Sequence, residues 1–121
     1  MTIGRWAPVV VWAAVILIST SLPGQAVPPG PPGIDKAVHF GAYAVLGVLG
    51  VHAAVGMRMA PVRTIVVVLL TTAAFAAIDE WHQGFIPGRY PDVADWVADV
   101  AGATIGVGTM ALFTFRRPAR S

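Results

Sequence analysis

The chain has 121 residues, enough for one domain, and 56% of them are hydrophobic while only 12% are charged. A soluble domain is about 25% charged, so this composition excludes an ordinary soluble protein and indicates a membrane protein. The net charge is +2, but the basic residues lie at the edges of apolar runs and form no patch, which argues against nucleic acid as a partner. There is no cysteine, which excludes disulfides, thiolate nucleophiles and cysteine-ligated metal sites.

Four apolar runs are long enough to cross a membrane, because a spanning helix takes about 20 residues. They cover approximately residues 6–22, 37–57, 62–78 and 93–115. The sequence therefore predicts an all-α membrane protein, a bundle of four transmembrane helices in the lipid bilayer, and leaves its oligomeric state open. The first run has an alternative, because Arg5 precedes it and Gly24-Gln25-Ala26 follows it, as in a cleaved secretory signal.

Segment 23–36 is predicted to be an outer loop, and its PPGPPG sequence at residues 28–33 is typical of a stiff, polyproline-like connector. Residues 116–121 are predicted to form a basic cytoplasmic tail. Six basic residues lie at the N-terminus, in the second loop up to the start of the third run, and in this tail: Arg5, Arg58, Arg63, Arg116, Arg117 and Arg120. Because cytoplasmic segments are enriched in Lys and Arg, we expect both termini in the cytoplasm.

The opposite side of the membrane would carry all six acidic residues and only two basic residues, Lys36 and Arg89, for a net charge of −4 with neutral histidines. We therefore expect a polar site on the extracytoplasmic side of the cell membrane. Three segments bring polar groups to this level.

The first polar segment opens the second apolar run. Asp35, His39 and Tyr43 are spaced i, i+4, i+8, so they share one helix face. His39 and Tyr43 would lie about 6 Å and 12 Å further along the axis than Asp35, at 1.5 Å per residue. Asp35 is either a helix cap or a functional group, and His39 and Tyr43 are either interfacial groups or part of a site.

The second polar segment directly follows the third apolar run. It contains Asp79, Glu80 and Gln83. Acidic residues at a helix C-terminus oppose the helix dipole. We therefore expect something to hold them there: Lys36, Arg89, a proton or a cation. His82 is expected to be a solvated loop residue.

The third polar segment opens the fourth run. Asp92 is a candidate N-cap and Asp95 a candidate capping-box acid, but capping does not explain Asp99. Asp99 shares a helix stripe with Asp95, Gly102 and Gly106, and the two glycines form a GxxxG pair that permits close helix packing. The acids should therefore face the bundle interior, where an ionisable group is by default a functional candidate.

Together these segments predict a polar pocket. Arg89 could hold a phosphate or carboxylate through its planar fork. Asp35, Glu80, Asp95 and Asp99 could bind a divalent cation, and His39 could carry a proton near neutral pH. No catalytic residue is assigned. The candidate pocket residues are Asp35, Lys36, His39, Tyr43, Asp79, Glu80, Gln83, Arg89, Asp95 and Asp99.

These motifs resemble the VanZ-like family of small bacterial membrane proteins. The resemblance rests on DKxxHFxxY at residues 35–43, DExxQ at 79–83 with FIPGR at 85–89, and DxxxDxxGxxxG at 95–106, and covers residues 8–112. Asp99 departs from the asparagine that is common in the family. The family is named for low-level resistance to the glycopeptide teicoplanin, so the resemblance implies a cell-envelope protein without implying a defined reaction.

The leading hypothesis is a membrane protein whose outward-facing pocket binds or handles an anionic envelope component. Lipid-linked phosphates and peptidoglycan stem carboxylates, both from cell-wall precursors, are the candidates. A membrane hydrolase or transferase on lipid-linked phosphates is the alternative, although HExxH, P-loop and GxSxG motifs are absent from the sequence. A structural module and a proton- or ion-coupled transporter remain as further readings.

Overall fold

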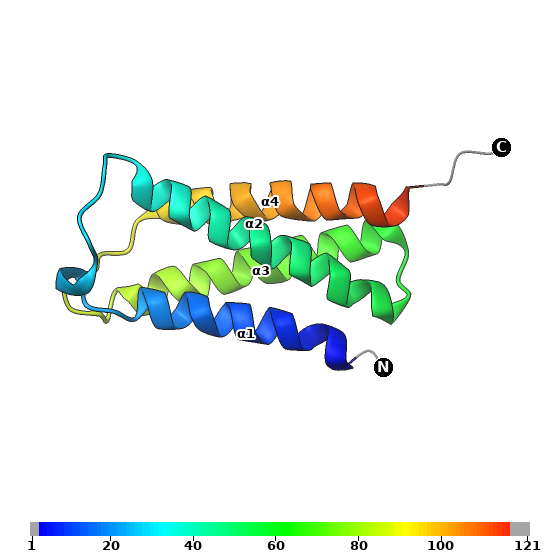
Figure 1. Ribbon diagram of the computed structural model, residues 1–121, viewed down its shortest axis with the longest axis horizontal. Coiled ribbons are helices and arrows are strands. Elements are labelled where there is room, and N and C mark those ends of the chain that lie inside the picture. Colours follow the sequence, from blue (N-terminus) through cyan, green and yellow to red (C-terminus); the bar gives the residue numbers. More distant parts are fainter. Residues whose placement is uncertain (1–2, 117–121) are drawn as a thin grey trace.

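Four long helices form the protein (Figure 1). The computed structural model describes residues 3–116, so Arg117 and Arg120 of the predicted basic tail lie outside the described residues. The helices are α1 (Ile3–Thr20), α2 (Ile34–Ala54), α3 (Pro61–Gln83) and α4 (Val93–Phe115), with short 3-10 turns η1 (Gly24–Ala26) and η2 (Val55–Met57). The described residues contain no strand. The expected all-α bundle is thereby confirmed.

Each helix is long and apolar enough to cross a membrane. The 23 residues of α3 rise about 35 Å, compared with about 30 Å for the hydrocarbon core of a bilayer. At the polar residues, two helices extend beyond the predicted runs. Helix α2 begins at Ile34, inside the predicted outer loop, and α3 continues past Ile78 to Gln83. The extension of α3 is polar in sequence, and burial of Asp79, Glu80 and Gln83 in the bundle explains why it stays helical.

Helices α2 and α4 make the most extensive helix–helix contact. A methyl group at Gly102 would overlap the carbonyl oxygen of Phe40, and one at Gly106 would overlap that of Ala44. The two helices can approach this closely only because both positions lack a side chain. The predicted role of the glycine pair is confirmed.

Helix α1 is the least buried of the four, with Ile16 as its one buried residue within the described chain. It is attached to α2 by side-chain hydrogen bonds to backbone carbonyls. The Trp12 Nε1–H donates to Ala42 O at 2.8 Å, and the Arg5 guanidinium donates to His52 O at 2.8 and 3.0 Å. The exposed apolar side chains of α1 include Ile3, Val10, Val11, Val15 and Ile18.

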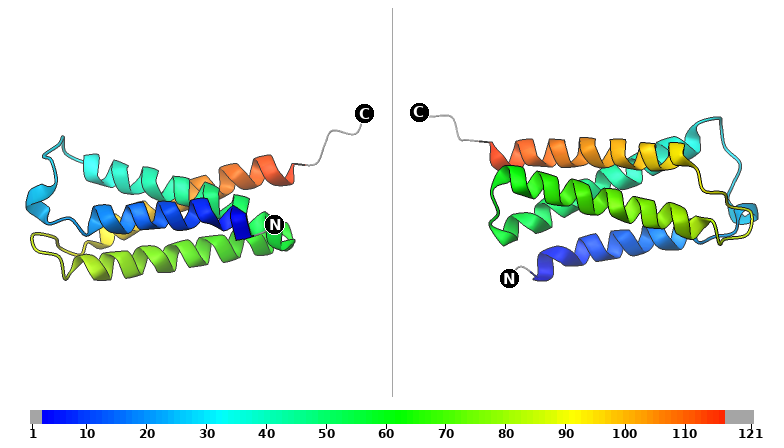
Figure 2. Two further views of the ribbon diagram at one scale, coloured as in Figure 1. Left: turned by 60° about the horizontal axis from the view of Figure 1, so that its bottom comes forward. Right: turned by 180° about the vertical axis from the view of Figure 1, so that it is seen from behind.

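The start of α1 and the end of α4 lie at one end of the bundle, and the α1–α2 and α3–α4 connections lie together at the other (Figures 1 and 2). We call this second end, where α1 and α3 finish and α2 and α4 begin, the polar end. Its two connections touch, because Gly24 N–H donates to Pro87 O at 2.9 Å. The start of α1 and the end of α4 lie at the same end of the bundle, as expected for a chain that crosses a membrane four times. The cytoplasmic location of that end stays a prediction.

Candidate functional site

The polar end gathers side chains from three helices, as the spacing of the sequence motifs predicts. Helix α2 contributes its first turns, α3 its last turns and α4 its first turns. Every predicted pocket residue except Arg89 lies on one of these helices: Asp35, Lys36, His39, Tyr43, Asp79, Glu80, Gln83, Asp95 and Asp99.

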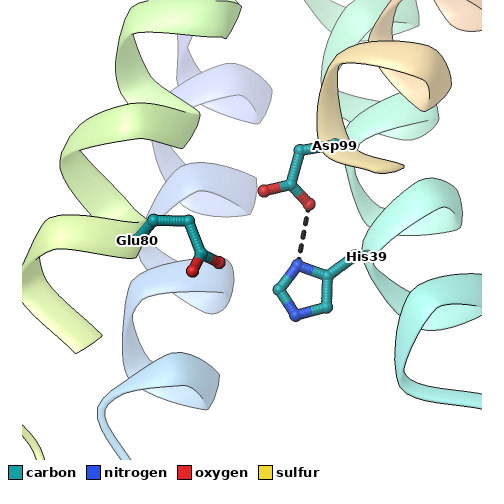
Figure 3. A group of neighbouring side chains, drawn as sticks. All are labelled: His39, Glu80 and Asp99. Atoms are coloured by element: carbon teal, nitrogen blue, oxygen red, sulfur yellow. Dashed lines mark hydrogen bonds and ion pairs between the residues drawn. The ribbon is translucent and has the colours of Figure 1, made fainter. Parts of the chain in front are cut away.

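His39 and Asp99 form the centre of this region (Figure 3). His39 Nδ1 lies 2.8 Å from Asp99 Oδ1. The Asp99 side chain is 0% exposed and that of His39 13%. The second carboxylate oxygen of Asp99 is buried and has no hydrogen-bond partner among residues 3–116. The carboxylate of Glu80 lies close to both, and one potential ligand atom from each of the three residues falls within 4.8 Å of the others.

Lys36 forms ion pairs with three neighbouring acids. Its ammonium group pairs with Asp95, with Asp92 at 2.9 Å and with Asp35 at 3.1 Å. Asp35 and Asp95 therefore bind an internal cation, in place of the divalent ion that the sequence suggested for them. The Lys36 ammonium, followed by the Ala94 N–H, holds the pKa of the exposed Asp92 carboxyl below its usual range.

Asp79 is fully buried and is held by two hydroxyl groups. The Thr20 hydroxyl donates to its Oδ1 at 2.7 Å, and the Tyr43 hydroxyl donates to its Oδ2 at 3.2 Å. Sequence reasoning missed Thr20; its only signal is a hydroxyl residue ending the first apolar run. The sequence offered Lys36 and Arg89 as candidates to hold Asp79. Among residues 3–116, neither of them forms an ion pair with it.

Glu80 is also buried and is fixed by groups on two helices. Its Oε1 accepts a hydrogen bond from Gln83 Nε2 at 3.2 Å, and its Oε2 accepts one from the backbone N–H of Asp92 at 3.0 Å. Glu80 and Gln83, three residues apart, therefore share a face of α3. These two bonds orient the carboxylate and tie the end of α3 to the start of α4.

The caps differ in part from the predictions. Asp92 is the N-cap of α4, as expected, and accepts from Ala94 N at 2.9 Å. Asp95 is no capping-box acid, since its carboxylate pairs with Lys36. Asp35 is no N-cap either: Gly33, with φ 83°, occupies that position, and Asp35 lies in the first turn.

Arg89 lies apart from the acids. The segment Ile86–Arg89 forms a turn closed by Arg89 N–H donating to Ile86 O at 3.0 Å, with Gly88 at φ 75°, as a type II turn requires at its third position. This turn directs the guanidinium to the end of α1, where it donates to Leu22 O at 3.0 Å and Ser19 O at 3.3 Å. Of the two basic residues that were candidates to hold the acids, Lys36 pairs with them and Arg89 forms no ion pair among residues 3–116. His82, expected in a loop, is in α3 and half-buried.

A cavity of about 190 Å³ lies beside this cluster, between α1, α2 and α3. Part of its lining is apolar and part is polar, the polar part including His39, Tyr43 and Asp79. Ser19, whose carbonyl accepts from Arg89, lines it as well. His39 therefore belongs both to the cavity wall and to the group it forms with Glu80 and Asp99.

No curated protein and no solved structure matches this chain. A model of one protein family, described as VanZ/LLP1, matches residues 3–114. The match extends over all four helices and includes every residue of the polar end discussed above. The chain belongs to the VanZ/LLP1 family.

Proposed function

We propose that this protein binds an amphiphilic, anionic component of the cell envelope, of the lipid-linked phosphate class, at the polar end of its bundle. The observation that carries the proposal is the cavity between α1, α2 and α3, which combines apolar residues with His39, Tyr43 and Asp79. Binding sites for small molecules have this character, with an apolar lining and a few polar groups that fix orientation.

The size of the cavity suits part of such a ligand. Its volume of about 190 Å³ is below the roughly 300–1,000 Å³ of pockets that enclose a drug-sized molecule. The cavity would therefore take the segment next to the head group, and the rest of the apolar chain would run along the lipid-facing surface. A peptidoglycan stem carboxylate lacks such a chain and makes less use of the apolar lining.

Arg89 is the group that would attract the anionic head. Its guanidinium donates to Ser19 O, and Ser19 lines the cavity, so the charge lies at the C-terminal end of α1. A guanidinium has five N–H donors. Two hydrogen bonds to Leu22 and Ser19 account for part of them within residues 3–116, which leaves donors for a phosphate. The charge distribution of the sequence favours the extracytoplasmic side for this site.

The test is binding of a polyisoprenyl phosphate to the purified protein in nanodiscs, with the uncharged polyisoprenol as the reference ligand. We expect tighter binding of the phosphate, and a loss of roughly tenfold or more in Arg89→Ala, because hydrogen bonds to charged groups contribute about 1.5–3 kcal/mol. Arg63→Ala, at the other end of the bundle, is the charge-matched control. Equal affinity for phosphate and alcohol would contradict the proposal.

A second pair of variants tests the cavity itself. Ala42→Leu projects a larger side chain into the cavity that Ala42 lines and is expected to weaken binding of the phosphate. Gly41→Leu introduces the same side chain one residue earlier, where a Cβ added to the glycine would have no heavy atom within 4 Å apart from its chain neighbours and the backbone of its own helix. This variant should leave binding unchanged. Equal affinities of the two variants would place the ligand elsewhere.

Hydrolysis of such a ligand is the second candidate function. His39 lines the cavity and is hydrogen-bonded to the buried Asp99 at 2.8 Å, and a histidine oriented by a carboxylate is a common general base. Release of inorganic phosphate from the polyisoprenyl phosphate by wild type, and its loss in His39→Gln, would support this function. Binding without turnover would leave the protein as a binding module.

A further inference from the structure

We propose that His39, Glu80 and Asp99 bind a divalent transition-metal ion. Each residue comes from a different helix, α2, α3 and α4 respectively, and the three side chains converge on one space (Figure 3). One potential ligand atom from each lies within 4.8 Å of the other two. Ligand bonds of about 2.0–2.2 Å place two ligand atoms of a tetrahedral ion roughly 3.3–3.6 Å apart, so side-chain shifts of up to roughly 1 Å would complete the site.

Asp99 provides a second observation, independent of the distances, that favours a bound ion. Its side chain is 0% exposed, yet its Oδ2 has no hydrogen-bond partner within residues 3–116. In Figure 3 the carboxylate extends into the space between His39 and Glu80. A buried polar atom without a partner is rare in folded proteins and calls for an explanation such as a bound ion. An ion held by all three residues would satisfy this oxygen.

The charge around the three residues favours a cation. Glu80 and Asp99 are both buried carboxylates, and burial of two like charges is costly unless an opposite charge lies between them. The nearest ammonium, Lys36, is already shared among Asp35, Asp92 and Asp95. Lys36 forms no ion pair with Glu80 or Asp99 within residues 3–116. A divalent ion bound between these two carboxylates would offset both of their charges, with His39 as a neutral ligand.

The surroundings of Glu80 would hold a metal ligand in place. Its carboxylate accepts from Gln83 Nε2 and from the Asp92 N–H. Each carboxylate oxygen has a second lone-pair position, so these bonds leave room for an ion. Hydrogen bonds of this kind orient the ligands of many metal sites, which gives Gln83 and the start of α4 a positioning role.

The ligand set indicates the class of metal. One imidazole nitrogen with two carboxylate oxygens suits Zn²⁺, Mn²⁺ or Fe²⁺ better than Mg²⁺ or Ca²⁺, which prefer oxygen alone. Three protein ligands also leave a fourth position, as in catalytic zinc sites. His39 also lines the cavity, so a ligand bound in the cavity would lie beside one of the metal-binding residues. That consequence rests on the proposed function, whereas ion binding itself does not.

The test is calorimetric titration of the purified, chelator-treated protein in detergent with Zn²⁺ alone, using a tag without histidines. We expect one ion per chain. Asp99→Asn and Glu80→Gln should each weaken binding at least tenfold, because even outer-shell partners of metal sites contribute 10–100-fold. Asp35→Asn is the matched control, since its carboxylate is 62% exposed and pairs with Lys36, and it should bind as wild type does. Equal affinity of Asp99→Asn and wild type would overturn the proposal.

A second measurement needs no variant. Co²⁺ bound to nitrogen and oxygen ligands gives visible absorption bands, and we expect wild type to show them and Zn²⁺ to abolish them by competition. Absence of both the bands and Zn²⁺ binding would overturn the metal site even if the variants fail to fold. No envelope ligand is used in either measurement. Metal binding without lipid binding would therefore refute the proposed function alone, and lipid binding without metal binding would refute the metal site alone.

Discussion

Substitution of Gly102 by alanine should disturb both the packing of α2 on α4 and the site. The new methyl carbon would overlap the carbonyl oxygen of Phe40 and lie 2.8 Å from its carbonyl carbon and 2.9 Å from its Cα. Carbon atoms in contact prefer about 3.5–4.0 Å, so relief of the carbon contacts alone requires the two helices to separate locally by at least roughly 0.7–1.2 Å. Phe40 follows His39, and Gly102 lies one turn after Asp99, so the same displacement acts on the site.

The His39–Asp99 hydrogen bond should break as a result. Its length of 2.8 Å would grow to roughly 3.5–4.0 Å, beyond the 2.7–3.2 Å range of such bonds. Overpacking costs about 1–3 kcal/mol and a lost hydrogen bond about 1 kcal/mol more. We therefore expect Gly102→Ala to lower the free energy of unfolding by about 2–4 kcal/mol.

The assay is reversible unfolding in mixed micelles, followed by far-UV circular dichroism. Gly108→Ala is the control on the same helix, because no heavy atom lies within 4 Å of its added methyl group; its stability should change by less than about 1 kcal/mol. The ¹⁵N chemical shifts of the His39 ring report on the bond to Asp99. Equal stability of the two variants, with unchanged His39 shifts in Gly102→Ala, would refute this reasoning.

Two further predictions concern Asp79 and the phenotype. Tyr43→Phe and Thr20→Val each remove a hydroxyl donor from the fully buried Asp79, and each should destabilise the protein by about 1–3 kcal/mol in the same unfolding assay; wild-type stability of both would mean that Asp79 needs neither donor. In a deletion strain scored for teicoplanin and envelope-stress sensitivity, Asp99→Ala and Arg89→Ala should fail to complement at wild-type membrane levels. Full complementation would make the polar end a structural feature only.

The position of the polar residues along each helix could be predicted from the sequence, because it depends only on spacing within single helices. Apolar runs of spanning length fix where each helix enters the membrane, and the helical period puts Asp95, Asp99, Gly102 and Gly106 on one stripe. The expectation of a shared stripe holds in the structure, where Asp95 and Asp99 are buried and the glycines contact α2.

The partners of the charged groups could not be predicted in this way. Lys36 and Arg89 were both candidates to pair with the acids, and the sequence offered no means to choose. The structure pairs Lys36 with Asp95 and its neighbours, while the turn at Pro87-Gly88 carries Arg89 to the end of α1. Thr20, on a helix far from the acidic motifs in sequence, becomes a donor to Asp79.

A four-helix membrane protein with its acids at one end follows from the amino-acid sequence alone, since hydrophobic length and helical periodicity are local properties. The packing of the helices sets which acids pair with Lys36 and which are held by hydroxyl groups, and it brings His39, Glu80 and Asp99 into one space. The reason is physical: hydrogen bonds and ion pairs act over about 3 Å, and distances of that size between different helices depend on how α2, α3 and α4 pack together.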